Sequence, residues 1–210
     1  VSNPVGGATA PSGATTVPTT PAPLTHRQIL IVFSGLMAGL LLAALDQTVV
    51  ATALPTIVGE LGGLDHYSWV VTAYLFSSTV STPLYGKISD LYGRKAVFQT
   101  AILIFLAGSL LAGLAQTMVQ LILCRGLQGA GAGGLMAMAF AVVGDVVSPR
   151  ERGRYTGYLG SVFAFASVVG PLVGGFIVDH VSWRWVFLIN LPVGAMAFVV
   201  TSRVLTLPVV

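Results

Sequence analysis

The sequence predicts an all-α integral membrane protein, built as a bundle of six transmembrane helices. Of its 210 residues, 55% are hydrophobic and only 8% are charged, whereas soluble domains carry roughly 25% charged residues. The apolar residues fall into six long stretches, and about 20 residues are needed to span the hydrocarbon core of a bilayer. The charged residues lie mainly in the connections between these stretches. A soluble helical protein would instead show amphipathic helices, each with one polar face.

The chain divides into three segments. Residues 1–25 are rich in Pro, Thr, Ala, Gly and Ser and contain no charged residue. Such a composition buries too little apolar surface to offset the entropy of ordering, so we expect a disordered cytoplasmic tail. We expect residues 26–206 to form the six-helix bundle and residues 207–210 to be a truncated C-terminal end.

The six spans follow one another along the chain with short connections. Asp46 interrupts the first span and Arg125 interrupts the fourth. We expect the spans at about residues 28–57, 69–85, 96–114, 119–147, 155–178 and 185–205.

The basic residues predict how the bundle is oriented. If the compartments alternate from one connection to the next, eight of the ten Lys and Arg residues fall on one side, Arg184 falls on the other, and Arg125 lies within a span. Cytoplasmic loops are enriched in Lys and Arg, so we expect both termini in the cytoplasm and the protein in the cell membrane. The eight residues are Arg27, Lys87, Arg94, Lys95, Arg150, Arg152, Arg154 and Arg203.

Asp46 and Arg125 are the candidate functional charges. An ionisable residue at the bilayer centre costs a few kcal/mol and normally faces the bundle interior or a water-filled cavity. At 1.5 Å per residue, Asp46 lies roughly 13 Å and Arg125 roughly 9 Å below the outer ends of their spans. We therefore expect either an ion pair or one shared polar cavity. The functional interpretation is substrate or proton coupling through the carboxylate, and the alternative is a static polar contact between two helices.

Glycine and proline mark the fourth and fifth spans. Arg125, Gly129 and Gly133 recur every four residues, so they share one helix face, and small residues there let a neighbouring backbone approach closely. In the fifth span Gly170 and Gly174 form a similar pair, and Pro171 removes a backbone hydrogen bond and is expected to bend the helix.

A short cytoplasmic loop is expected at residues 86–95, between the second and third spans, which makes these spans antiparallel neighbours. Asp90 is placed to cap a helix start or to pair with a basic group. Gly93 permits the left-handed backbone of a tight turn.

Five segments together resemble the major facilitator superfamily, and within it the drug:proton antiporters of the fourteen-helix type. Gly86 to Lys95 is similar to the superfamily loop G-x-x-x-D-x-x-G-R followed by a basic residue. Arg125 to Gly131 resembles its fourth-helix pattern R-x-x-Q-G-x-G, and the Gly170-Pro171 to Gly174-Gly175 segment resembles the antiporter pattern of the fifth helix. Leu45 to Pro55 and Trp183 to Pro192 are similar to segments of the fourteen-helix subgroup.

The resemblance implies roles for these residues. It associates Asp46 and Arg125 with proton coupling, and it implies a substrate cavity that includes Asp46, Gln47, Thr48 and Gln128. It associates the loop with gating of the inside-to-outside switch, and the glycines and Pro171 with helix packing and the antiporter motif. The gating set is Gly86, Asp90, Gly93, Arg94 and Lys95, and the packing set is Gly129, Gly133, Gly170, Pro171, Gly174 and Gly175.

The resemblance also implies a function, which is proton-driven export of amphipathic, often cationic compounds without a cofactor or a metal. The sequence contains no P-loop pattern for ATP, no nucleophile–base pair that suggests an enzyme, and too little net charge, +3, for a nucleic-acid surface. A cavity at the midplane forms between two six-helix halves, so the partners we expect are lipid, substrate, protons and a second helical half. The alternatives are a superfamily transporter of an amino acid, sugar or lipid, and a non-transporting membrane fragment or partner subunit.

Overall fold

The computed structural model describes residues 26–204, which form helices and contain no strand. The expected tail of residues 1–25 and the expected end at 207–210 lie outside the described residues. The elements are α1 (His26–Leu61), the 3-10 turn η1 (Leu64–His66), α2 (Tyr67–Tyr92), α3 (Arg94–Gly113), α4 (Met118–Val146), α5 (Arg152–His180), α6 (Arg184–Leu188) and α7 (Asn190–Val204).

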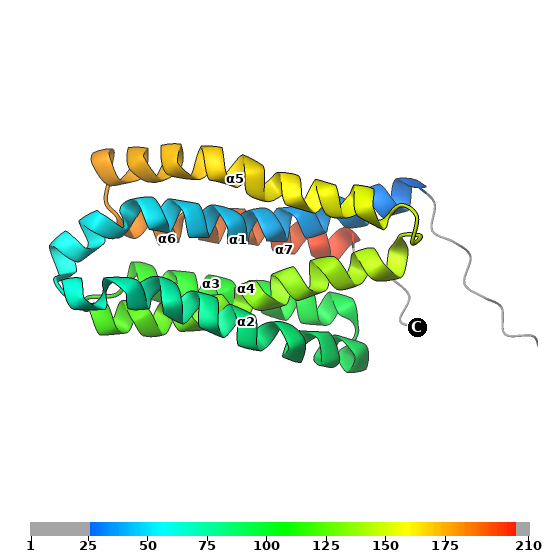
Figure 1. Cartoon of the computed structure of the whole chain (residues 1–210), viewed down its shortest axis with the longest axis horizontal. Helices are drawn as coiled ribbons and strands as arrows, with labels where there is room; N and C mark the ends of the chain where they lie inside the picture. The colour runs from blue at the N-terminus through cyan, green and yellow to red at the C-terminus, as the bar shows by residue number, and fades with distance from the viewer. Residues whose placement is uncertain (1–25, 205–210) are drawn as a thin grey trace, which may run out of the picture.

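Apart from the short α6, the helices form two groups of three (Figure 1). In one group α4 packs between α2 and α3, and in the other α1 packs between α5 and α7. The groups are joined where α1 meets α4 and where α3 meets α7. Successive long helices run in opposite directions, so the connections rich in Lys and Arg lie at the same end of the bundle. We call this the basic end.

Five segments of the described chain are long and apolar enough to cross a membrane. α2 has 26 residues, which is also long enough, but it is less apolar because it is rich in Ser and Thr. Thr79 and Thr82 donate to carbonyls of α2 itself at 2.8 Å, and Ser81 donates to the Ala130 carbonyl of α4 at 3.1 Å. These hydroxyl groups are therefore satisfied within the bundle. The five segments are Val32–Leu61, Arg94–Gly113, Met118–Asp145, Arg152–His180 and Arg184–Arg203.

The prediction of a loop at residues 86–95 is wrong. α2 continues as a helix to Tyr92, and α3 begins at Arg94, so Gly93 is the whole connection. Gly93 has φ +84° and ψ 146°, a backbone conformation that is essentially restricted to glycine. The turn role expected for Gly93 is therefore correct, but it is performed by one residue rather than by a loop.

The sixth span is divided into α6 and α7, where a single helix was expected. Pro192 lies two residues after the start of α7 at Asn190. Its ring has no N–H to donate and clashes with the carbonyl of the residue four positions earlier, Leu188. The helix therefore stops at Leu188 and starts again at Asn190, because proline is tolerated in the first turn of a helix.

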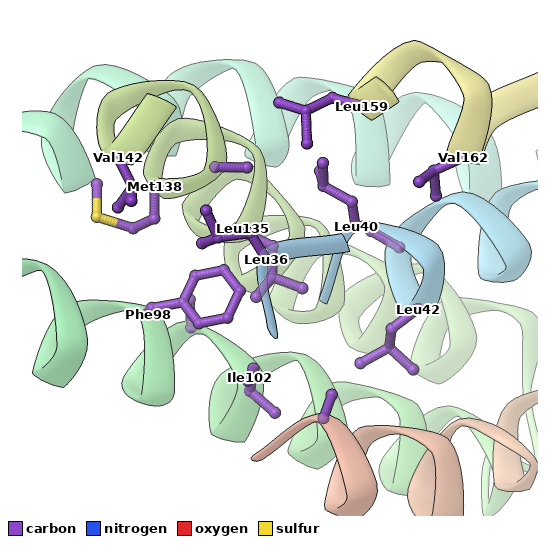
Figure 2. Close-up of a cluster of buried hydrophobic side chains, with 14 of the residues drawn as sticks. Leu36, Leu40, Leu42, Phe98, Ile102, Leu135, Met138, Val142, Leu159 and Val162 are labelled. Carbon is purple, nitrogen blue, oxygen red and sulfur yellow. The ribbon is translucent and has the colours of Figure 1, made fainter. Parts of the chain in front are cut away.

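The buried apolar side chains form two clusters, one nearer the basic end and one nearer the opposite end. The first includes Leu36 and Leu40 of α1 and Phe98 of α3 (Figure 2), and the second includes Ile57 and Trp183. On α1 the first cluster ends at Ala44 and the second starts at Val49. Asp46 lies between them, so the two apolar clusters enclose a polar layer.

Glycines on α4 allow its neighbours to approach closely. A Cβ added at Gly131 would lie 2.5 Å from the backbone nitrogen of Phe105 in α3. Gly129 and Gly133 face the backbones of Tyr74 and Ser78 in α2, so the predicted small-residue face of α4 packs against α2. Gly170 and Gly174 of α5 contact α1 at Thr48 and Val49 in the same way.

Replacement of Gly131 by alanine should lower the free energy of unfolding by about 1–3 kcal/mol, because the added methyl group meets backbone that cannot move aside. Gly144→Ala on the same helix is the matched control, since nothing lies within 4 Å of its added Cβ. That variant should be neutral or stabilising by up to ~1 kcal/mol. Thermal unfolding in detergent measures both, and equal effects of the two substitutions would contradict the packing argument.

Candidate functional site

The polar layer is centred on the carboxylate of Asp46 in α1. The Arg125 guanidinium of α4 donates to Asp46 Oδ2 at 2.5 Å, and the Gln128 amide, one turn further along α4, donates to Asp46 Oδ1 at 2.7 Å. Arg125 also donates to Gln128 Oε1 at 2.7 Å. Of the two arrangements expected from the sequence, the structure therefore contains the ion pair. The exposed fractions of Asp46, Arg125 and Gln128 are 1%, 2% and 0%.

Aromatic rings enclose the guanidinium of Arg125. Its central carbon lies 4.1 Å from the ring centroid of Tyr74 in α2 and 6.0 Å from that of Phe187 in α6. A cation held over an aromatic face is stabilised electrostatically, and more so in a desolvated site. Among the buried side-chain atoms of the described residues, Arg125 Nε has no hydrogen-bond partner, so the guanidinium retains unused hydrogen-bonding capacity next to the carboxylate.

The sixth span reaches the same carboxylate from another side. Asn190, the first residue of α7, donates to Asp46 Oδ1 at 2.7 Å and to the Ser109 hydroxyl of α3 at 2.9 Å. The Ser109 hydroxyl donates in turn to the Phe187 carbonyl of α6 at 2.8 Å. Asp46, Arg125, Gln128, Asn190 and Ser109 are all buried, so side chains from α1, α3, α4 and α7 form one buried network.

The remaining residues predicted for a substrate cavity lie on α1 next to this network. Gln47 and Thr48 are half-buried, and the Thr48 hydroxyl donates to the Leu45 carbonyl at 3.0 Å. Asp46 and Gln128 are enclosed by the network itself. The assignment of these four residues to a substrate cavity stays a prediction.

A second charged group lies at the basic end. Arg94, the first residue of α3, donates to Asp145 of α4 at 2.9 Å and pairs with Asp90 of α2 at 3.2 Å. Arg94 also contacts the Ser89 hydroxyl. One guanidinium thus joins the ends of α2, α3 and α4. Asp90 pairs with a basic group, which was one of its two expected roles.

Lys95 and Gly86 complete the predicted gating set. The Lys95 ammonium donates to the Ser202 carbonyl near the end of α7 at 2.6 Å. The Gly86 carbonyl accepts from the Ser89 hydroxyl at 2.7 Å, within α2. Gating by these residues stays a prediction, as do the functional roles of Pro171 and Gly175. Pro171 is exposed on α5, and nothing lies within 4 Å of a Cβ added at Gly175.

The opposite end of the bundle is closed by different contacts. The Arg184 guanidinium donates to the carbonyl of Gly113, the last residue of α3, at 2.9 Å and to that of Ala115, just after it, at 2.7 Å. The Trp183 indole donates to Glu60 of α1 at 2.7 Å.

Sequence reasoning missed Tyr74, Ser109, Asn190 and Asp145. Asn190 gave a usable signal, because an amide within an apolar span has to find a partner. Asp145 lies near the end of the fourth span, where a carboxylate facing a basic connection is an ion-pair candidate. Ser109 and Tyr74 gave no signal, because Ser and Tyr are common in transmembrane helices. The described residues include no cluster of three His, Cys, Asp or Glu side chains that could hold a metal ion.

The bundle and its buried network define a class of protein, a multi-pass α-helical membrane protein with an ion pair in its core. Residues 36–210 match the profile of the Major Facilitator Superfamily, and the chain belongs to that superfamily. It is 46% identical over 173 residues to the multidrug transporter protein MdtP of Bacillus subtilis, covering 82% of this chain and 32% of MdtP. It is 47% identical over 163 residues to multidrug resistance protein 3 of the same organism, covering 78% of this chain and 32% of that protein.

Solved structures share the fold. The proton:xylose symporter XylE aligns with a TM-score of 0.76 at 14% identity, over 84% of this chain and 45% of that structure. The human organic anion transporter MFSD10 aligns with a TM-score of 0.69 at 21% identity, over 86% of this chain and 49% of that structure. The chain spans about a third of the length of the two Bacillus relatives and about half of these structures.

Replacing one member of the central ion pair should lower the free energy of unfolding more than replacing both members with apolar residues. Asp46→Leu leaves a buried guanidinium unpaired and should lower the free energy of unfolding by about 3–5 kcal/mol. The double variant Asp46→Leu/Arg125→Met should recover more than half of that loss, because a buried pair replaced by apolar groups is often nearly neutral. Unfolding midpoints in detergent measure both, with the exposed Asp179→Asn as a control expected to stay within ~0.5 kcal/mol. Additive losses in the double variant would argue against the pairing.

Proposed function

We propose that this chain is the N-terminal six-helix half of a proton-coupled multidrug efflux transporter of the fourteen-helix type. Asp46 is the proton-binding group and Arg125 its partner. In this proposal the protein lies in the cell membrane with both ends in the cytoplasm, and a second helical half completes the substrate cavity. The observation that carries the proposal is the buried Asp46–Arg125 pair, in a superfamily member whose similar relatives are named multidrug transporters.

The chemistry of antiport follows from this pair. A proton on Asp46 removes the negative charge that attracts Arg125, so proton binding changes the interaction that joins α1 to α4. A cationic substrate near the carboxylate would have the same electrostatic effect as the proton, and the two would therefore compete. Mutual exclusion of two ligands is a coupling free energy, and it acts equally in both directions. If the two bind in turn, the transporter exports the cationic substrate in exchange for protons.

An apolar cleft near this site supports amphipathic substrates. A cleft of about 340 Å³ lies between α1 and α5, within the range of ~300–1,000 Å³ for small-molecule sites. Leu41 lines it, and five residues of helix, roughly 8 Å, separate Leu41 from Asp46. Such a cleft suits the apolar body of a substrate, while the Asp46 carboxylate is buried against α4 and α7 and does not line it. The lining residues are Met37, Ala38, Leu41, Ser161, Val162 and Phe165.

Proton-coupled efflux should depend on both charges. In inverted vesicles that contain this chain with a co-expressed C-terminal half, we expect dye efflux driven by an imposed pH gradient. Asp46→Asn and Arg125→Ala should each reduce the rate more than tenfold, because neither leaves a proton-responsive ion pair. Asp179→Asn, an exposed carboxylate at the end of α5, should keep the original rate.

Other outcomes of this measurement separate the alternatives. Efflux by the chain without a second half would mean that the chain assembles a working transporter by itself. Transport of an amino acid, sugar or lipid without dye efflux would favour a physiological substrate. No transport of any solute, with the variants indistinguishable from the original chain, would favour a non-transporting membrane protein.

We propose that Arg94 holds the basic end closed, with the rest of the predicted gating set around it. Asp145→Asn removes one carboxylate from this partly exposed group, so the free energy of unfolding should change by less than ~1 kcal/mol. The rate of switching should nevertheless change, which cysteine labelling of the basic end can follow in the assembled transporter. The matched control is Glu151→Gln, an exposed carboxylate at the same end that does not contact Arg94. Equal labelling rates in both variants and the original chain would contradict a gating role.

A further inference from the structure

We infer that Asn190 is a positioning residue for the Asp46 carboxylate, with Ser109 behind it, and that the break in the sixth span exists to place it there. This inference rests on the proposed function, because it assigns a further residue to the same proton-binding site. It concerns side chains of α7 and α3, whereas the ion pair is formed by α1 and α4. Asn190 touches the carboxylate directly at 2.7 Å.

The hydrogen-bonding chemistry determines which way the Asn190 amide faces. An ionised carboxylate can only accept hydrogen bonds, so the NH₂ group of Asn190 must face Asp46. Its second N–H is directed to the Ser109 hydroxyl at 2.9 Å. The single O–H of Ser109 is used on the Phe187 carbonyl at 2.8 Å, so the Ser109 oxygen is left as an acceptor for Asn190. Ser109 therefore prevents the amide from turning its oxygen toward the carboxylate.

The break between α6 and α7 makes this arrangement possible. The Phe187 carbonyl lies in the last turn of α6, where it accepts from the Ile189 N–H and also from the Ser109 hydroxyl. Asn190 begins α7, where Pro192 prevents the helix from running on unbroken from Leu188. Pro192 thus sets where α7 begins, and Asn190 at that position joins the Phe187 carbonyl, through Ser109, to Asp46.

Three donors stabilise the charged form of Asp46, and they come from two sides. Arg125 and Gln128 approach from α4, and Asn190 approaches from α7. Among the described residues, the ionisable groups packed around this carboxylate are Arg125 and, beneath it, Tyr74 of α2. α3, α6 and α7 contribute Ser109, Phe187 and Asn190, none of which titrates. Of these three donors, Asn190 is the one that does not come from α4.

The test follows the protonation of Asp46 by its infrared carbonyl band in the chain reconstituted in bilayers. The band is assigned by its absence in Asp46→Asn. Asn190→Leu, which keeps the side-chain size but removes both donors, should shift the pH midpoint of the band, because one hydrogen bond to the carboxylate is lost. Ser109→Ala should shift it less, because the amide keeps its donor but loses its fixed orientation.

Thr201→Val is the matched control on the same helix. Thr201 is also fully buried, but its hydroxyl donates only to the Ala197 and Phe198 carbonyls of α7. This variant should leave the midpoint unchanged. If Asn190→Leu folds and its midpoint agrees with that of Thr201→Val, the inference is overturned, and Asn190 is then a structural residue only.

The pH profile of dye efflux, measured with a co-expressed C-terminal half, separates this inference from the proposed function. A shifted infrared midpoint together with a shifted efflux profile supports both. A shifted midpoint in a protein that shows no proton-driven efflux supports the positioning role and contradicts the function. Proton-driven efflux with an unshifted profile in Asn190→Leu supports the function and overturns the positioning role.

Discussion

A negative charge in the middle of an apolar bundle is the constraint on which the rest of this structure depends. Desolvation of a carboxylate costs several kcal/mol even after relaxation, so the charge persists only with a complete set of donors. Asp46 obtains them from Arg125, Gln128 and Asn190. These residues belong to α4 and α7, which are therefore held in register with α1 at the level of Asp46. The hydrogen bonds of this one carboxylate therefore fix how α1, α4 and α7 are positioned along the bundle axis.

The small residues of α4 are the geometric condition for this network. α4 lies close to both α2 and α3, and any side chain at Gly129 or Gly131 would push those helices away. Close approach of α2 also brings the Tyr74 ring against the guanidinium. Gly108 of α3 makes a similar contact, since a Cβ there would lie 2.6 Å from the backbone nitrogen of Gln128. Packing and electrostatics therefore depend on the same few positions.

Much of the fold could be predicted because lipid imposes simple requirements. Span length and the distribution of Lys and Arg identified the helices and their common basic end, and helix rise placed Asp46 and Arg125 at similar depth. The sequence did not reveal Asn190 and Ser109 as members of the network, because Asn190 reaches Asp46, and Ser109 reaches Asn190, through tertiary packing that has no sequence period. The continuous α2 up to Gly93 was missed because its polar last turns resemble a loop in composition. The break at Ile189 was readable from Pro192, but apolar length gave the opposite answer.

The one-residue connection at Gly93 has a mechanical consequence. A longer loop would absorb relative movement of the helices it joins, whereas one residue leaves almost no slack. Near the basic end α2 and α3 are therefore held closely together at Gly93. Lys95, the second residue of α3, also donates to the carbonyl of Ser202 near the end of α7. α2, α3 and α7 are thus joined at the basic end, and the other end of α7 carries Asn190.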